Sequence, residues 1–199
     1  MSRAPIVLGI AGSPRRFGNS DRLLGAALAG AREAGAETRT LVAADAGLRH
    51  CLGCNACSLD GECVQHDGGP ALYRAIDEAD AIIVVTPVYF ASVPGVLKVL
   101  IDRMQPYWAR TYALKRPRPA RRPGAILIAR GGGDPYGFEH AEATVRSAFA
   151  VLDIDVLDVL ATPGVDRPAD LEAHPEVLER AHALGAVVTA EATKRLIER

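Results

Sequence analysis

Short apolar runs alternate with amphipathic segments along most of the chain. The run at 81–86 reads AIIVVT, which is typical of a parallel strand buried on both faces. The intervening segments place apolar residues at helical spacing, as Leu72, Ala75 and Ile76 do. The pattern predicts strands at 6–11, 38–42, 81–86, 124–129 and 154–161, and helices at 21–34, 69–78, 94–104, 138–152 and 175–197.

Five strands separated by helices predict an α/β fold with a parallel sheet covered on both faces. Right-handed crossovers leave few topologies, and the simplest is a doubly wound, five-stranded sheet of the flavodoxin type, with strand order 2-1-3-4-5. We expect one such domain over 1–199. In these sheets a ligand binds beyond the carboxyl ends of the strands. The informative loops therefore follow the first, third and fourth strands, and they read GSPRRFGNS, PVYFASVPG and RGGGDPYG.

The polar residues of the first loop suit a phosphate group. Ser13, Asn19 and Ser20 supply short hydrogen-bonding groups, and Arg15 supplies a charged fork. Asn19 and Ser20 also offer a cap for the helix predicted to begin at position 21, whose free N–H groups favour an anion. The loop is neither G-x-G-x-x-G nor a Walker sequence, which favours a mononucleotide. An ordinary polar turn with a helix cap is the alternative.

The other two loops carry aromatic residues and glycines. Two adjacent aromatic residues, Tyr89 and Phe90, cannot both face the same core, so we expect at least one to face the cleft. Core packing is the alternative for both. Three consecutive glycines, Gly131, Gly132 and Gly133, would let the backbone approach a ligand, although they also suit a flexible turn.

Four cysteines fall within thirteen residues and are all the cysteine of the chain. Their spacing is C-x2-C-x2-C-x5-C, formed by Cys51, Cys54, Cys57 and Cys63. One 4Fe–4S cluster would use all four thiolates. Structural zinc usually takes two cysteine pairs that lie a dozen or more residues apart, which is not the spacing here. Zinc and an empty or oxidised loop remain as alternatives.

Composition narrows the function classes. The net charge of −1 gives no electrostatic case for binding nucleic acid or an anionic membrane. No apolar run approaches the ~20 residues of a membrane span. The first residues lead directly into a predicted strand without a signal-peptide pattern, so we expect a cytoplasmic protein, in which disulfides are disfavoured.

Three blocks of sequence resemble one family. The G-S-P-R-x-x-G-N-S loop is similar to that of the NADPH-dependent FMN reductase group of flavodoxin-like proteins. The segment from Cys51 to Cys63 resembles the compact cysteine motif of iron–sulfur flavoproteins in that group, and 79–83, 86–90 and 98–103 match its central stretch. Relatives often carry Asp-Asp-Met soon after the last cysteine. Here Asp67 is expected to keep part of that role.

The resemblance implies a flavin-dependent oxidoreductase. It places Ser13, Arg15, Asn19 and Ser20 around the FMN phosphate, and it implies a homodimer or homotetramer. FMN and a 4Fe–4S cluster would relay electrons between an acceptor and a donor, either a small carrier such as ferredoxin or NAD(P)H. An NAD(P)H-dependent FMN or quinone reductase without a cluster, and a flavin sensor or storage protein, are the alternatives. Along the isoalloxazine the resemblance places Pro87, Val88, Tyr89 and Phe90.

Two segments interrupt the regular alternation. One is the cysteine-rich loop at 45–67, and the other is a basic, proline-rich excursion at 105–123. We interpret the basic charges of the excursion as a solvated surface, with docking of an acidic carrier or a nucleotide phosphate as the alternative. Asp102 and Arg103, at a predicted helix end, suggest a structural ion pair.

Overall fold

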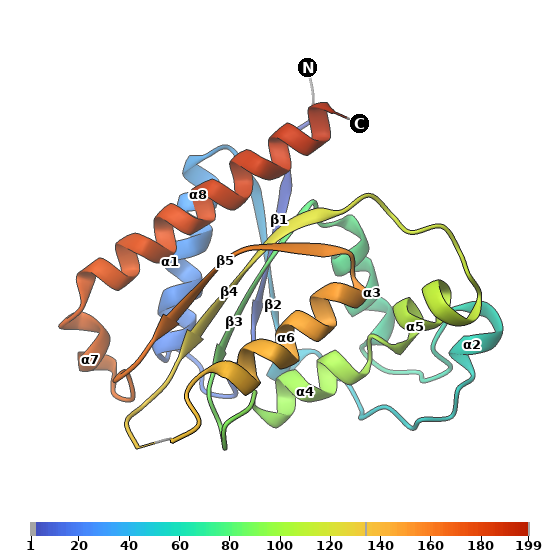
Figure 1. Cartoon of the computed structure of the whole chain (residues 1–199), viewed down its shortest axis with the longest axis horizontal. Helices are drawn as coiled ribbons and strands as arrows, with labels where there is room; N and C mark the ends of the chain where they lie inside the picture. Colours follow the sequence, from blue (N-terminus) through green and yellow to red (C-terminus); the bar gives the residue numbers. More distant parts are fainter. Residues whose placement is uncertain (1–2, 134, 199) are drawn as a thin grey trace.

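A computed structural model describes residues 3–133 and 135–198, and within these ranges five parallel strands form one sheet (Figure 1). The strand order is 2-1-3-4-5, which confirms the flavodoxin-like arrangement expected from the sequence. The strands are β1 (Ile6–Ala11), β2 (Glu37–Val42), β3 (Ala81–Pro87), β4 (Arg122–Ala129) and β5 (Ile154–Thr162).

Helices cover the sheet in two layers, and each layer has its own hydrophobic core. Residues of α1 (Asn19–Glu33) and α8 (Pro175–Ile197) form one core with the sheet. Residues of α3 (Gly69–Glu78), α4 (Gly95–Asp102) and α6 (Glu139–Val151) form the other. Figure 1 shows the two layers on opposite sides of the sheet.

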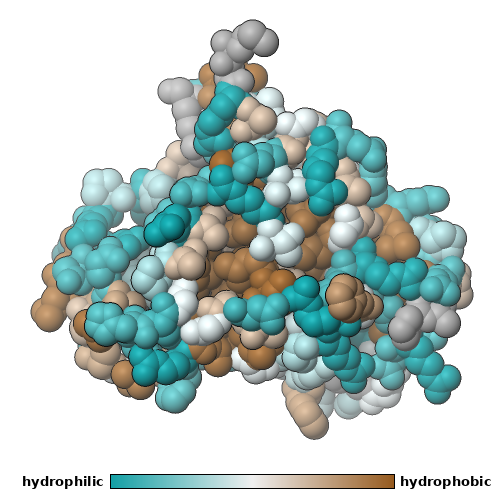
Figure 2. Space-filling model, turned by 180° about the vertical axis from the view of Figure 1, so that it is seen from behind, coloured by the Kyte–Doolittle hydropathy of each residue, from teal (hydrophilic) through white to brown (hydrophobic). Residues whose placement is uncertain are grey.

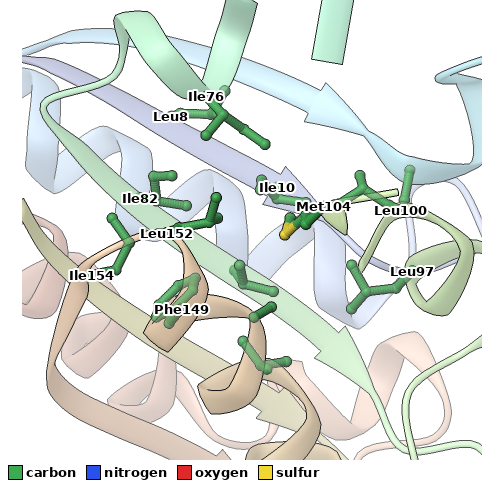
Figure 3. Close-up of a cluster of buried hydrophobic side chains, with 14 of the residues drawn as sticks. Leu8, Ile10, Ile76, Ile82, Leu97, Leu100, Met104, Phe149, Leu152 and Ile154 are labelled. Carbon is green, nitrogen blue, oxygen red and sulfur yellow. The ribbon is translucent and has the colours of Figure 1, made fainter. Parts of the chain in front are cut away.

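Alternation along the strands divides the apolar residues between the two cores. In β1, Leu8 and Ile10 face the core that contains α3, α4 and α6, whereas Val7 faces the other. Figure 3 shows Leu8 and Ile10 in this first core, together with Leu100 and Phe149 from the covering helices. Burying an aliphatic or aromatic side chain of this size contributes about 1.5–3 kcal/mol.

The layer formed by α1 and α8 is packed backbone against backbone. A Cβ atom at Gly30 would lie 1.9 Å from the carbonyl oxygen of His182, and one at Gly185 would lie 1.8 Å from that of Ala27. Neither position can therefore accept a side chain unless the helices separate. This contact fixes α1, whose N-terminus borders the cleft described below.

The first helix begins two residues earlier than the sequence predicts. Gly18 is the N-cap, so Asn19 and Ser20 lie in the first turn and are buried, rather than capping a helix at position 21. Glycine is an acceptable N-cap residue. Because the helix begins at Asn19, both polar residues belong to its first turn instead of preceding it. At the other end, Gly35 has a positive φ of 94° and follows the helix, as expected.

Short elements occur where the sequence predicts irregular chain. The cysteine-rich loop contains α2 (Cys57–Asp60), and the excursion begins with α5 (Gln105–Trp108) and a π-helical turn (Ala109–Ala113) before it joins β4 at Arg122. A further short helix, α7 (Pro168–Glu172), precedes α8. Elements of four or five residues contain too few positions to show a hydrophobic period.

No helix within the described ranges is long and apolar enough to cross a membrane. Figure 2 shows the side of the molecule opposite to that of Figure 1: hydrophilic residues cover much of this face, and hydrophobic ones gather near its centre.

Candidate functional site

A cleft of about 270 Å³ lies at the carboxyl ends of β1, β3 and β4. The loops that follow these strands contribute to its walls, as the topology predicts. The loop after β5 adds Val165 and Asp166, which the sequence analysis did not consider. That contribution follows from the same rule, because the carboxyl ends of all parallel strands lie at one edge of a sheet. Of the predicted site residues, the cleft brings together Ser13, Arg15, Asn19, Ser20, Pro87, Val88, Tyr89 and Gly131.

The first loop is fixed to the sheet by main-chain contacts. The N–H group of Gly12 donates to the carbonyl oxygen of Val85 over 2.7 Å. A Cβ atom at Gly12 would lie 2.6 Å from Cδ2 of Leu97, so a side chain would displace the loop. The buried hydroxyl of Ser13 accepts a hydrogen bond of 3.1 Å from the N–H group of Arg15. These contacts hold the start of the loop against β3 and α4.

The N-terminus of α1 is suited to bind an anion. Among the residues that the structure describes, no side chain caps this 15-residue helix. The side chain of Asn19 donates to the carbonyl oxygen of Arg167 over 3.1 Å, whereas its buried Oδ1 has no hydrogen-bond partner in the described structure. Uncapped N–H groups and the helix dipole favour a negatively charged group. The local chemistry therefore fits a phosphate.

Arg15, at the cleft, makes only a weak ion pair within the described structure. Arg15 lies 3.7 Å from Asp166, and both side chains are about 70% exposed, so this ion pair contributes little to stability. The guanidinium group of Arg15 also lies 6.0 Å from the ring centre of Tyr89. Arg16 pairs instead with Asp45 at 2.5 Å. Arg15 is therefore available to an anion in the cleft.

A tight turn follows β3 and separates the two adjacent aromatic residues. Tyr89 and Ser92 exchange main-chain hydrogen bonds of 2.8 and 3.0 Å, and the residues between them, Phe90 and Ala91, have φ values of 49° and 63°. Positive φ at both central residues is the pattern of a type I′ turn. Tyr89 lines the cleft, whereas Phe90 is fully exposed and borders a hollow between α4 and α6.

The three consecutive glycines do not share one environment. Gly131 lines the cleft, and a Cβ atom there would lie 3.3 Å from the Cβ atom of Asp166. Gly132 and Gly133 lie outside the cleft lining, and Gly133 has a positive φ of 87°. Close approach of the backbone to the cleft is thus a property of Gly131.

The four cysteines line a second hollow, of about 340 Å³. All four are free thiols, Cys54 is exposed, and burial raises the pKa of Cys57. Within the part of the chain that is described, no three His, Cys, Asp or Glu side chains form a site for a metal ion. Tetrahedral Zn–S bonds would require sulfur atoms about 3.8 Å apart. A polynuclear cluster binds each thiolate to a different iron, so it accepts wider spacing, and four thiols around one hollow provide a suitable donor set.

A buried arginine connects this hollow to the core. The side chain of Arg103 is 1% exposed and pairs with Asp67, which is 6% exposed, over 2.5 Å. Its guanidinium group also donates to the carbonyl oxygen of Arg49 over 3.0 Å and to Sγ of Cys63 over 3.4 Å. Arg103 and the N–H groups of Arg49 and Gly69 hold the pKa of the Asp67 carboxyl well below its usual range.

This arrangement corrects the ion pair expected between adjacent residues. Asp102 pairs with Lys98 at 2.6 Å, one helical turn earlier, whereas Arg103 points inward to Asp67. Tyr73 supports Arg103 by donating to its carbonyl oxygen over 2.9 Å, and burial raises the pKa of Tyr73 to about 12. The sequence indicates a role for Asp67 but gives no local signal for its partner, Arg103.

Comparisons with known proteins identify a family and several similar proteins. Residues 5–163 match the family described as NADPH-dependent FMN reductase. An iron–sulfur flavoprotein of Methanocaldococcus jannaschii is 35% identical over 191 residues, which are 94% of this chain and 97% of the relative. An iron–sulfur flavoprotein of Archaeoglobus fulgidus is 38% identical over 128 residues, which are 64% of this chain and 56% of that relative.

Solved structures of low sequence identity share the fold. An NAD(P)H:quinone oxidoreductase from Methanothermobacter marburgensis has a TM-score of 0.67 at 20% identity, covering 92% of this chain and 98% of that one. A flavodoxin from the domain Archaea has a TM-score of 0.58 at 12% identity, covering 94% and 99% of the two chains.

Proposed function

Since the chain belongs to the NADPH-dependent FMN reductase family, a group of flavin-dependent oxidoreductases, we propose that it binds FMN in the cleft at the carboxyl ends of β1, β3 and β4. The observation that carries the proposal is the uncapped N-terminus of α1, which borders this cleft beside Arg15. An anion there would be stabilised by main-chain N–H groups, the helix dipole and the guanidinium group.

The proposed roles of the cleft residues follow from their positions. Ser13, Arg15, Asn19 and Ser20 surround the phosphate. The N–H groups of Val88 and Tyr89 already donate to the carbonyl oxygens of Ala129 and Ser92, so the loop after β3 contributes apolar contacts to the flavin ring rather than hydrogen bonds from these two groups. Bound FMN would supply one- and two-electron transfer, while the protein supplies binding and orientation. The ring contacts we propose are Pro87, Val88, Tyr89 and Gly131, because Phe90, Gly132 and Gly133 lie outside the cleft lining.

We further propose that the cysteine hollow holds a 4Fe–4S cluster. Its support is the convergence of Cys51, Cys54, Cys57 and Cys63 on one hollow, together with the names of the curated relatives. Such a cluster would pass single electrons between the flavin and a small carrier such as ferredoxin. A homodimer or homotetramer is also proposed, because Trp108 and Phe90 present apolar surface at one hollow.

A second candidate function is an NAD(P)H-dependent FMN or quinone reductase without a cluster. The description of the matched family, which names NADPH and FMN, favours it. The two functions differ in the electron donor. Reduction of the flavin by reduced ferredoxin and not by NADPH would support the relay, whereas rapid reduction by NADPH would support the reductase.

Anaerobic purification tests both cofactors. We expect FMN to be released on denaturation, with about four iron and four sulfide ions per chain and broad visible absorption. A colourless protein that does not bind added FMN would contradict the proposed flavin site. FMN without iron, after reconstitution with iron and sulfide, would leave the reductase as the function.

A further inference from the structure

The part of the excursion that follows α5, residues 109–123, is called the basic segment here, and it contacts the cysteine-rich loop. The Nε atom of Arg110 donates to the carbonyl oxygen of Gly61 over 2.9 Å, and its Nη2 atom donates to the carboxylate of Glu62 over 2.6 Å. The Nη2 atom of Arg116 donates to the carbonyl oxygen of Asp60 over 2.7 Å. Three consecutive residues between Cys57 and Cys63 are thus bound by two guanidinium groups.

The backbone of the basic segment is shaped to place these two arginines side by side. The π-helical turn closes with the N–H group of Leu114 donating to the carbonyl oxygen of Ala109 over 2.9 Å. Lys115 then takes a positive φ of 52°, and the N–H group of Arg116 donates to the carbonyl oxygen of Arg110 over 2.8 Å. Irregular helical turns of this kind are frequent at functional sites.

The cysteine-rich loop is shaped to receive them. Gly61 follows α2 with a φ of 80°, a conformation that favours glycine. A Cβ atom at Gly61 would lie 2.8 Å from Cγ of Arg110 and 3.1 Å from Nη1 of Arg116. The longest gap in the cysteine motif is therefore also the part that is in closest contact with the two arginines.

The remaining arginines of the basic segment bind elsewhere. Arg118 pairs with Asp153 at 2.7 Å and donates to the hydroxyl of Tyr112 over 2.9 Å, while Arg121 pairs with Asp155 at 2.6 Å. These side chains fasten the segment to the body of the protein. The arginine side chains of the segment are thus engaged within the chain, which agrees with a structural role more than with a docking surface.

We propose that Arg110 and Arg116 form a guanidinium clamp, a pair of positioning residues that hold Cys57 and Cys63 toward the hollow before a cluster binds. The clamp rests on the proposed function because it concerns the proposed cluster site, but its contacts are made within the metal-free chain. It binds the main chain of Asp60 and Gly61 and the carboxylate of Glu62, rather than a thiol. Each contact joins a cation to an oxygen acceptor, which is the stronger class of hydrogen bond.

Thiol reactivity of the reduced, metal-free full-length protein tests the clamp. Each cysteine is quantified by mass spectrometry during alkylation with iodoacetamide. In the double variant Arg110→Ala and Arg116→Ala, we expect Cys57 and Cys63 to react about tenfold faster, because the loop opens locally. Cys54 is already exposed, so its rate should change little. Equal rates in the variant and the wild type would overturn the proposal.

Arg121→Ala is the matched control, because it removes the same charge from the same segment but not from the clamp, and Asp155 keeps its pair with Arg195. An equal rise in reactivity in this control would indicate general loosening and would contradict the clamp. Arg110→Lys keeps the charge but lacks the planar fork that donates to both acceptors, so an intermediate rate at Cys57 is expected. This variant keeps the test valid if the double variant does not fold.

Reconstitution with iron and sulfide separates the clamp from the proposed function. If the wild type incorporates iron, the double variant should incorporate less and show weaker visible absorption, while Arg121→Ala should match the wild type. If the wild type incorporates none, the proposed cluster is wrong, and the alkylation rates still decide whether the clamp exists.

Discussion

The cleft at the carboxyl ends of the strands is shaped mainly by main-chain contacts, such as the hydrogen bond from Gly12 to Val85. The cysteine hollow is shaped by arginine side chains that lie later in the sequence and contact the cysteine-rich loop, above all Arg103 and Arg110. Main-chain contacts follow from the topology of the sheet, so the shape of the cleft depends mainly on the fold. The contacts around the hollow are made by individual side chains, so the shape of the hollow depends on the identity of those residues.

This difference predicts where single substitutions act most strongly. Breaking a buried ion pair by removing one partner leaves an uncompensated charge and costs about 3–5 kcal/mol. A single hydrogen bond to a charged group contributes about 1.5–3 kcal/mol, and a local backbone strain about 1–3 kcal/mol. The hollow should therefore be more sensitive to side-chain replacement than the cleft.

The largest effect is expected for Arg103→Ala. The substitution leaves the carboxylate of Asp67 buried without its partner, and it should lower the free energy of unfolding by about 3–5 kcal/mol. Urea unfolding of the metal-free protein measures the change. Arg16→Ala is the control, because it breaks an exposed pair with Asp45 and should cost less than about 1 kcal/mol. Similar losses in both variants would remove the contrast between the two regions.

The second largest effect is expected for Asp67→Asn, when the free energy of unfolding is measured by urea unfolding over a series of pH values. The folded-state pKa of Asp67 is depressed below the unfolded value of about 4, chiefly by the hydrogen bond from Arg103. Its stabilising contribution is therefore fully present above about pH 4 and is lost as the pH falls through the folded-state pKa. The free energy of unfolding of the wild type should exceed that of the variant most at neutral pH, and this difference should become smaller below about pH 4. A gap that stays constant down to pH 2 would contradict this role for Asp67.

A smaller effect is expected at the cleft for Arg15→Ala. Loss of one charged hydrogen bond should weaken FMN binding about tenfold, whereas riboflavin, which lacks the phosphate, should bind almost unchanged. Fluorescence titration with the two flavins gives both dissociation constants. Arg22→Ala, which removes a neighbouring charge on α1 that is paired with Glu172, should leave both constants unaltered. Equal weakening for both flavins would place Arg15 at the ring rather than the phosphate.

The sequence predicts the cleft better than the hollow for the same physical reason. The apolar run of β3 and the polar loop after β1 are local signals, and the topology then brings them together. The pair between Asp67 and Arg103 joins residues 36 positions apart and leaves no local pattern. Asp102 and Arg103 are neighbours in sequence, but they diverge because successive helical side chains point about 100° apart.

The turn after β3 offers the smallest and most local test. Ala91 has a positive φ of 63°, which disfavours residues that carry a Cβ atom. Ala91→Gly should therefore raise the free energy of unfolding by about 0.5–1 kcal/mol, as measured by urea unfolding. Ala143→Gly makes the same chemical change on an exposed position of α6, where it should lower stability by about 0.5–1 kcal/mol. Opposite signs for one substitution would show that backbone conformation governs the stability of this turn, whereas a loss of stability in both variants would mean that the turn is not strained.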